Sequence, residues 1–206
     1  MSEFLSQGLF YSIIQATICL CVLSLFLAIF IDFALYSRKE QVQKEKKSVV
    51  ETGTMTLFFI IFYMILRNGA GVISVPFDFL KEFLMILGTG MIVTGCIVNI
   101  NGRLHLGRNW ANQIKIYQEQ TLVQTGMYKI VRHPLYASII LMFYGACLVY
   151  RNIISLIAVS IVFVPFMYYR ASQEEKLLML RFPQYHEYKR RTGMLFPKII
   201  KRRGGG

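Results

Sequence analysis

Five stretches of the chain are long, apolar and free of formal charge, and polar segments separate them. The longest is Phe4–Ile31, with 28 residues, followed by Phe83–Gly102 with 20 and Asn152–Tyr169 with 18. Pro134–Tyr150 and Thr52–Leu66 are shorter, with 17 and 15 residues. A helix of about 20 apolar residues crosses a ~30 Å hydrocarbon core. The pattern therefore predicts an all-α integral membrane protein with about five transmembrane helices.

The apolar stretches Pro134–Tyr150 and Asn152–Tyr169 follow each other directly, with only Arg151 and Asn152 at their junction. So short a connection predicts a tight antiparallel helical hairpin. Such a hairpin returns the chain to the side from which it came. The segment Tyr168–Glu175 is then expected at the same level as Arg132–Tyr136.

The basic residues are distributed unevenly among the polar connections. Of the 23 Lys and Arg, five lie in residues 38–47, five in 101–135 and ten in 170–206, which leaves three for the opposite set of loops. The positive-inside rule then places the first loop, the third loop and the C-terminus in the cytoplasm, and the N-terminus outside. The net charge of +12 is explained by this sorting and by anionic lipid headgroups, so nucleic acid is not an expected partner.

The length of 206 residues suits one structural domain. Within it, residues 1–100 hold the N-terminal transmembrane helices. Residues 101–206 hold a polar loop, the helical hairpin and a C-terminal cytoplasmic catalytic region. The four cysteines all lie in apolar stretches without CxxC spacing, which predicts small core residues and no metal site.

Ionisable residues at the edges of the apolar stretches are the first candidates for a site. Charged groups at membrane depth are costly, so they indicate function by default. Pro134 favours the first turn of a helix, which places His133 near its cap with the ring at the mouth of the bundle. In the alternative interpretation, His133 only caps the helix and Tyr136 only anchors it at the interface.

Arg170 and Glu174 are four residues apart and share one face of a helix. They can form an ordinary ion pair there. In a site, the planar guanidinium of Arg170 suits a carboxylate or phosphate, while Glu174 suits a cationic group of a ligand. Glu175 points elsewhere and is expected to face water or a basic neighbour.

Several short motifs of the second half occur in a fixed order. They are G-x-Y-x-x-x-R-H-P-x-Y from Gly126, R-x-x-x-E from Arg170, F-x-x-Y-x-x-Y from Phe182, and a Thr-Gly…Phe-Pro ending at Pro197. In this combination the chain resembles the isoprenylcysteine carboxyl methyltransferase family and its phospholipid methyltransferase relatives. The resemblance covers roughly residues 101–200.

The resemblance implies an integral membrane enzyme that uses S-adenosylmethionine without the Rossmann fold of soluble methyltransferases. It implies that Arg170 faces the substrate carboxylate and that Arg170, Glu174 and His133 serve catalysis. Gln120 departs from the family, because many members carry His there. The cofactor is then surrounded by Gln113, Gln120, Thr121, Leu122, Val123, Tyr128, His133, Pro134, Leu135, Tyr136 and Glu174.

The predicted function is carboxyl O-methylation of a lipid-like or prenylcysteine-like substrate. The substrate is expected to enter from the bilayer and the cofactor from the cytoplasm, with membrane lipids but no protein as further partners. One alternative is a phospholipid N-methyltransferase, which needs a base such as His133 or Glu175. The others are an NADPH-dependent sterol-reductase-like protein and a non-enzymatic helical scaffold, which cofactor binding would distinguish.

Overall fold

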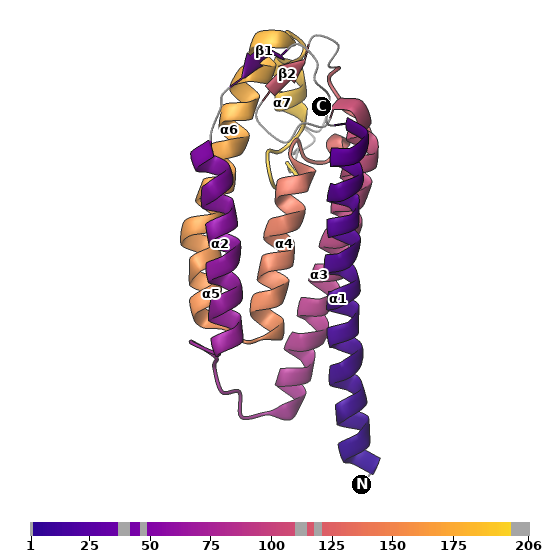
Figure 1. Cartoon of the computed structure of the whole chain (residues 1–206), viewed down its shortest axis with the longest axis vertical. Helices are drawn as coiled ribbons and strands as arrows, with labels where there is room; N and C mark the ends of the chain where they lie inside the picture. The colour runs from indigo at the N-terminus through magenta and orange to yellow at the C-terminus, as the bar shows by residue number, and fades with distance from the viewer. Residues whose placement is uncertain (1, 37–41, 46–48, 110–114, 118–120, 199–206) are drawn as a thin grey trace, which may run out of the picture.

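The computed structural model describes residues 2–36, 42–45, 49–109, 115–117 and 121–198 (Figure 1). All five predicted apolar stretches form helices within it. The helices are α1 (Ser2–Tyr36), α2 (Val49–Asn68), α3 (Asp78–Leu106), α4 (Pro134–Val149), α5 (Ile153–Ala158), α6 (Val164–Arg181) and α7 (Tyr185–Arg191). A π-helical turn, η3 (Val159–Phe163), joins α5 to α6 in one continuous helix, and short 3₁₀ turns are η1 (Gly107–Asn109) and η2 (Gly126–Lys129).

Three of the helices are long and apolar enough to cross a membrane. They are Gln7–Leu35, Asp78–Leu106 and Ile153–Arg181, each 29 residues long. The apolar parts of the other two, Gly53–Asn68 and Pro134–Val149, are shorter. The predicted class of membrane-embedded helical protein is therefore confirmed, while α2 and α4 stay predictions as transmembrane spans.

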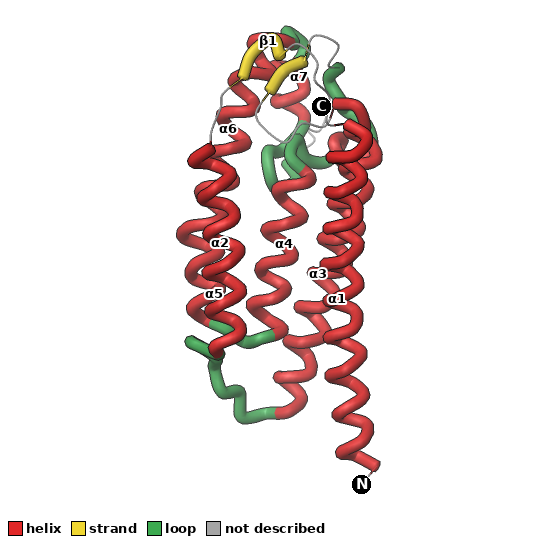
Figure 2. Tube along the Cα trace, viewed as in Figure 1, coloured by secondary structure: helices red, strands yellow, loops and turns green. Residues whose placement is uncertain are grey.

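The long helices run side by side with α4 near the middle (Figures 1 and 2). Helix α3 packs along α4, α1 packs on α3, and α2 lies beside α5. The C-terminal end of α6 and α7 gather at the end of the molecule opposite the N-terminus. The candidate residues of the sequence motifs lie at this end.

A small sheet at the same end was not predicted. Strand β1 (Val42–Glu45) pairs antiparallel with β2 (Lys115–Tyr117), which adds one short sheet to a fold that is otherwise helical, as predicted. The strands come from the first and third polar connections, which sequence analysis treated as loops. Each strand has only three or four residues, too few for a hydrophobic period to be recognised.

The interface between α3 and α4 depends on two glycines. A Cβ atom on Gly88 would meet the backbone oxygen of Gly145, and a Cβ on Gly145 would meet the backbone oxygen of Gly88. Small residues at such contacts let membrane helices approach closely and gain van der Waals contact. This close packing fixes α4, whose first turn carries part of the site.

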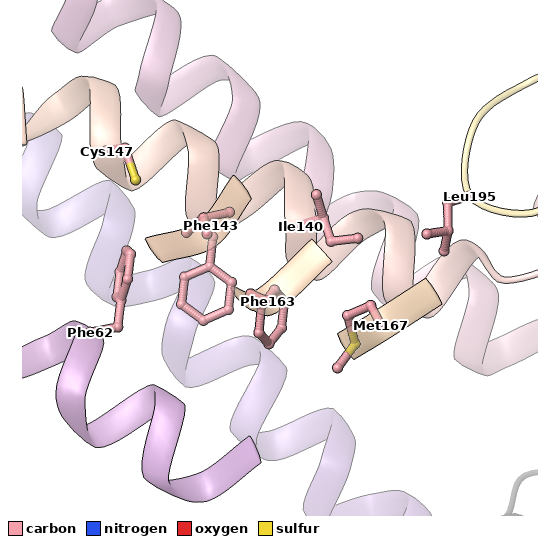
Figure 3. Close-up of a cluster of buried hydrophobic side chains, with 8 residues drawn as sticks. Phe62, Ile140, Phe143, Cys147, Phe163, Met167 and Leu195 are labelled. Carbon is pink, nitrogen blue, oxygen red and sulfur yellow. The ribbon is translucent and has the colours of Figure 1, made fainter. Parts of the chain in front are cut away.

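An aromatic cluster joins α2 to the helical hairpin (Figure 3). The ring of Phe143 on α4 lies 4.5 Å from that of Phe62 and 4.6 Å from that of Phe163, between ring centroids. Edge-to-face pairs at such distances contribute about 0.5–1.5 kcal/mol beyond their burial. The same cluster continues through Met167 on α6 to Leu195 in the C-terminal segment, so it packs against two of the segments that carry the site.

The predicted hairpin is confirmed at its tip. Helix α4 ends at Val149 and α5 begins at Ile153. Asn152 caps α5, because its Oδ1 accepts a hydrogen bond of 2.8 Å from the backbone N–H of Ser155. Its Nδ2 donates to the backbone oxygen of Ala70, also at 2.8 Å, and so fastens the α2–α3 connection to the hairpin.

Candidate functional site

The hairpin brings the end of α6 to the start of α4, as the sequence predicted. Pro134 occupies the first turn of α4, and His133 is the N-cap residue. The side chain of His133 makes no capping hydrogen bond, so the interpretation of His133 as a cap is not supported. Its ring lies instead beside the two carboxylates that α6 contributes, Glu174 and Glu175.

Glu175 is the inner carboxylate, and only 1% of its side chain is exposed. One oxygen accepts a hydrogen bond of 2.7 Å from Nε of Arg132, and the other lies 3.2 Å from Nζ of Lys189. Of the two alternatives predicted for Glu175, water or a basic neighbour, the structure shows the basic neighbour. The inward orientation of Glu175 follows from Arg132, which lies on the opposite segment and needs a buried counter-charge.

Residues 192–196, here named the C-terminal strap, close over Arg132. The backbone N–H of Arg132 donates to the oxygen of Gly193 at 2.9 Å, and that of His133 donates to the oxygen of Met194 at 3.1 Å. Nη1 of Arg132 also donates to the backbone oxygen of Thr192. The guanidinium and the backbone of Arg132 are thus both held by protein groups.

Glu174 is the outer carboxylate, with 37% of its side chain exposed. The hydroxyl of Tyr136 donates to Glu174 at 3.2 Å, and Nδ1 of His133 lies 3.6 Å from the same oxygen. The rings of His133 and Tyr136 are parallel, with centroids 5.5 Å apart. One open carboxylate is therefore placed against two aligned rings at the edge of the bundle.

The charge state of His133 follows from these neighbours. Burial of the ring opposes protonation, but the carboxylates of Glu174 and Glu175 outweigh it and raise the pKa of His133. Nε2 of His133 is buried without a hydrogen-bond partner among the described residues. The raised pKa favours the protonated ring, in which both nitrogens can only donate hydrogen bonds to a ligand.

Arg170 lies one helical turn before Glu174 and is 7% exposed. The described side chains of Arg170 and Glu174 do not form the ion pair that the sequence allowed as one alternative. Nη1 of Arg170 faces Sδ of Met55 at 3.0 Å, and its Cζ lies 5.9 Å from the centroid of the Tyr136 ring. Its Nε is buried and has no partner among the described residues. A thioether is a weak acceptor, so this guanidinium keeps unused donors.

Tyr128, which the family resemblance assigns to the cofactor, lies in the 3₁₀ turn η2 before α4. Burial, and then the charge of Glu174, raise the pKa of the buried Tyr128. The backbone oxygen of Tyr128 accepts a hydrogen bond of 2.6 Å from the hydroxyl of Tyr188 on α7. Tyr128 thus lies between the two segments that flank the site and stays a neutral donor near Glu174.

The predicted cofactor loop is described only in part. Gln113 and Gln120 lie outside the described residues. The backbone N–H of Thr121 donates to Oδ1 of Asn109 at 2.8 Å. Leu122 packs against the apolar cluster of α7, while Val123 is half-buried.

Pro134 and Leu135 form the first turn of α4 and touch α3. A Cβ atom on Gly102 would lie 3.5 Å from Cγ of Pro134 and 3.0 Å from a methyl carbon of Leu135. Their expected cofactor contacts therefore stay predictions, because the structure places both beside a neighbouring helix.

Three residues near the site were not found by sequence analysis. Met55 comes from α2, which has no polar marker that would place it beside Arg170. Lys189 looks like one of many basic residues of the C-terminal region. Asn109 follows α3 in the segment Leu106-Gly107-Arg108-Asn109, and a polar residue directly after a long apolar helix was the available signal.

Comparison with known proteins agrees with the motifs. Residues 87–180 match the family described as "Isoprenylcysteine carboxyl methyltransferase (ICMT) family". The chain is 36% identical to protein-S-isoprenylcysteine O-methyltransferase B of Arabidopsis thaliana over 108 residues, which cover 51% of this chain and 55% of that protein. It is 33% identical to protein-S-isoprenylcysteine O-methyltransferase of Saccharomyces cerevisiae over 137 residues, which cover 61% and 57%.

A relative with a different name also matches. The cobalt-zinc-cadmium resistance protein CzcN of Cupriavidus metallidurans is 31% identical over 100 residues, which cover 48% of this chain and 46% of that protein. The chain thus spans about half the length of these curated relatives. The predicted family resemblance is confirmed over residues 87–180, which include most of α3, all of α4 and the Arg170–Glu175 segment.

Proposed function

We propose that this chain, with its isoprenylcysteine carboxyl methyltransferase sequence at residues 87–180, is a membrane-embedded methyltransferase that uses S-adenosylmethionine. The acceptor is a carboxylate on a lipid-like or prenylcysteine-like substrate. The observation that carries this proposal is Arg170, a buried guanidinium with an unpaired Nε one turn from the half-exposed Glu174. The pair offers an anion site and a cation site at adjacent positions.

The residues present fit the cofactor by their chemistry. S-adenosylmethionine supplies a methyl group on a sulfonium and carries an ammonium, a carboxylate and an adenosine. Glu174 fits a cationic group of this molecule, and Nε2 of His133, which lies 3.4 Å from Glu175 but makes no hydrogen bond among the described residues, fits an acceptor. Tyr128, Tyr136 and the backbone of Thr121–Val123 complete the wall. Gln113 and Gln120 stay predicted contributors from the family resemblance.

The roles of the chain's residues follow from the acceptor chemistry. A carboxylate is ionised at neutral pH, so its attack on a methyl group needs no general base. Arg170 orients the carboxylate through parallel N–H donors, and its buried position removes water from the nucleophile. Holding two reactants in line lowers the activation free energy by on the order of 7–11 kcal/mol.

A carboxylate acceptor fits this site better than an amine. Methylation of an amine requires a base that removes a proton. The raised pKa of His133 favours its protonated form, which has no lone pair free to take a further proton, and Glu175 is engaged by Arg132 and Lys189. The phospholipid N-methyltransferase alternative therefore has no free base at the positions that sequence analysis named.

The proposed topology has five membrane spans, an outside N-terminus and a cytoplasmic site. The charge bias of 20 basic residues against three supports it. Labelling of intact cells with an impermeant thiol reagent tests it in a background without native cysteines. Phe77→Cys, at an exposed position between α2 and α3, should be labelled, and Lys198→Cys should not. The reverse pattern contradicts the proposed topology.

Cofactor binding is tested by titration calorimetry with S-adenosylhomocysteine on the purified full chain. The wild type should bind, and Glu174→Ala and His133→Ala should each lose most of the affinity. Glu187→Ala, which removes an exposed carboxylate on α7, is the matched control and should bind normally. Binding of NADPH without S-adenosylhomocysteine would favour the sterol-reductase alternative, and binding of neither would favour the scaffold.

A further inference from the structure

A continuous chain of polar contacts connects the first helix to the first turn of α4. Asp32 of α1 forms an ion pair with Nη1 of Arg103 on α3, and both side chains are largely buried. Nε of Arg103 donates to Oδ1 of Asn99 at 2.8 Å. Nδ2 of Asn99 donates to Oγ of Ser138 at 2.7 Å and to the backbone oxygen of Leu135 at 3.3 Å.

The order of donors and acceptors gives this chain a direction. The carboxylate of Asp32 fixes the guanidinium of Arg103, and the guanidinium takes the oxygen side of the Asn99 amide. The amide of Asn99 is then left with only its NH₂ group for α4. Arg103 and the acceptors on α4 favour the same orientation of the amide, since the oxygen of Leu135 and the hydroxyl of Ser138, which already donates to it, both need the NH₂ group.

The contact point on α4 lies inside the candidate site's own motif. Leu135 stands between His133 and Tyr136, the two residues whose parallel rings face Glu174. Ser138 reinforces the contact, since its hydroxyl donates to the same oxygen of Leu135 at 2.8 Å. Gly102 of α3 lets this turn approach closely, since a Cβ atom there would lie 3.0 Å from a methyl carbon of Leu135.

Burying this series of charged and polar side chains costs desolvation free energy, which the packing of two helices alone does not require. Apolar side chains of similar size pack two helices as well as a buried ion pair does, or better. An ionisable residue within a membrane helix therefore points to a function, and here the whole chain ends on the turn of His133 and Tyr136. Arg103 and Asn99 lie within residues 87–180, whereas Asp32 lies outside the family match.

We propose that Asp32 is a positioning residue for the cofactor site, acting through Arg103 and Asn99 on the first turn of α4. It sets the orientation of the two rings that face Glu174 without touching the ligand itself. The proposal rests on the proposed function, because it assigns Asp32 to the same cofactor site. It gives α1, which packs mainly on α3, a part in ligand binding (Figure 1).

Binding of S-adenosylhomocysteine to the full-length protein in detergent tests the proposal, with the melting temperature measured in parallel. Asp32→Asn should weaken binding by about tenfold or more, since hydrogen bonds to charged groups contribute about 1.5–3 kcal/mol. Asp32→Glu keeps the charge and should restore binding to within about threefold of the wild type. Asp78→Asn, which removes an exposed ion-pair carboxylate on α3, is the matched control and should bind normally.

The outcomes separate the two proposals. A wild type that binds no S-adenosylhomocysteine overturns the proposed function. A wild type that binds, together with an Asp32→Asn variant of unchanged affinity, overturns the positioning role even if the variant melts earlier. If Asp32→Asn does not fold, the affinity of Ser138→Ala tests the positioning role instead. This variant removes the hydrogen bond between Asn99 and Ser138 on α4 and leaves the ion pair of Asp32 with Arg103 intact. Ser138→Ala with weakened binding supports the role, and unchanged affinity overturns it.

Discussion

Arg132 and Arg170 lie at the same end of the molecule and are equally buried, with 8% and 7% of each residue exposed. Their surroundings differ. Arg132 is paired with Glu175 and donates to the backbone oxygens of Lys189 on α7 and of Thr192 in the C-terminal strap. Arg170 faces a thioether and an aromatic ring, and its Nε has no partner among the described residues.

This difference separates a structural arginine from one that is available to a ligand. A buried guanidinium is stable only when its donors are used. Arg132 meets this condition within the protein. Arg170 has an Nε–H donor that no described protein group uses, so a ligand has to supply its acceptor. A carboxylate fits the planar guanidinium best. The residue types are the same, and only their partners assign the roles.

The largest expected loss of stability comes from removing Arg132 from its buried ion pair with Glu175. Arg132→Met leaves Glu175 buried without its main partner, which should cost about 3–5 kcal/mol of stability. Thermal melting in detergent measures the loss. The double variant Arg132→Met/Glu175→Leu should be more stable than Arg132→Met alone, because no unpaired charge remains. A double variant as unstable as the sum of both single variants would contradict the buried-pair account.

Arg170→Lys tests the other arginine. Lysine keeps the charge but loses the parallel donors, so turnover should fall by about tenfold to hundredfold. The affinity for S-adenosylhomocysteine should change little, because Glu174 and the loop hold the cofactor. Methyl transfer to a prenylcysteine analogue measures turnover, and Arg190→Lys on the exposed face of α7 is the control. Near-normal turnover would refute the carboxylate role of Arg170 and favour an amine acceptor.

The pH dependence of stability should report His133, which both carboxylates contact. Its pKa is raised in the folded state, so its contribution is fully present below the unfolded pKa of about 6.5. That contribution is lost as the pH rises through the higher folded-state pKa. Stability should fall over this window by at most about 1.4 kcal/mol per pH unit, and His133→Gln should abolish the slope. A variant that keeps the wild-type slope would assign it to another group.

The smallest effect is expected at the exposed partner of Glu175. The side chain of Lys189 is 45% exposed, so water screens its interaction with the carboxylate. Lys189→Met should cost no more than about 1 kcal/mol, well below the cost of Arg132→Met. The melting temperatures of the two variants measured side by side give the comparison. Equal losses would mean that burial does not distinguish the two cations.

The sequence predicted the position of the site better than its internal arrangement. Pro134 indicated the start of α4, and the two-residue connection at Arg151 and Asn152 required the chain to return. These are local signals, and both were confirmed. The choice between Glu174 and Glu175 was harder, because neighbouring residues on a helix point about 100° apart and only the partner segment decides which one is buried.

Residues contributed by distant helices could not be predicted. Met55 lies in α2, and Asp32 is the ionisable residue at the edge of the first apolar stretch, in α1; the sequence does not show which neighbours either residue meets. Long-range packing, such as the Phe143 cluster and the contact of Gly88 with Gly145, places these helices. The short strands β1 and β2 were missed for the same reason, since each is defined only by its partner.

The C-terminal strap also has a consequence for the order in which the protein is made. The backbone N–H groups of Arg132 and His133 receive their partners from Gly193 and Met194, some 60 residues later in the chain. A ribosome adding ~5–20 residues per second needs on the order of 1–4 s to proceed from Glu175 to Met194. Until Gly193 and Met194 are added, the backbone N–H groups of Arg132 and His133 lack the partners that they have in the folded protein. The site is therefore complete only after the strap has been translated and has docked on Arg132 and His133.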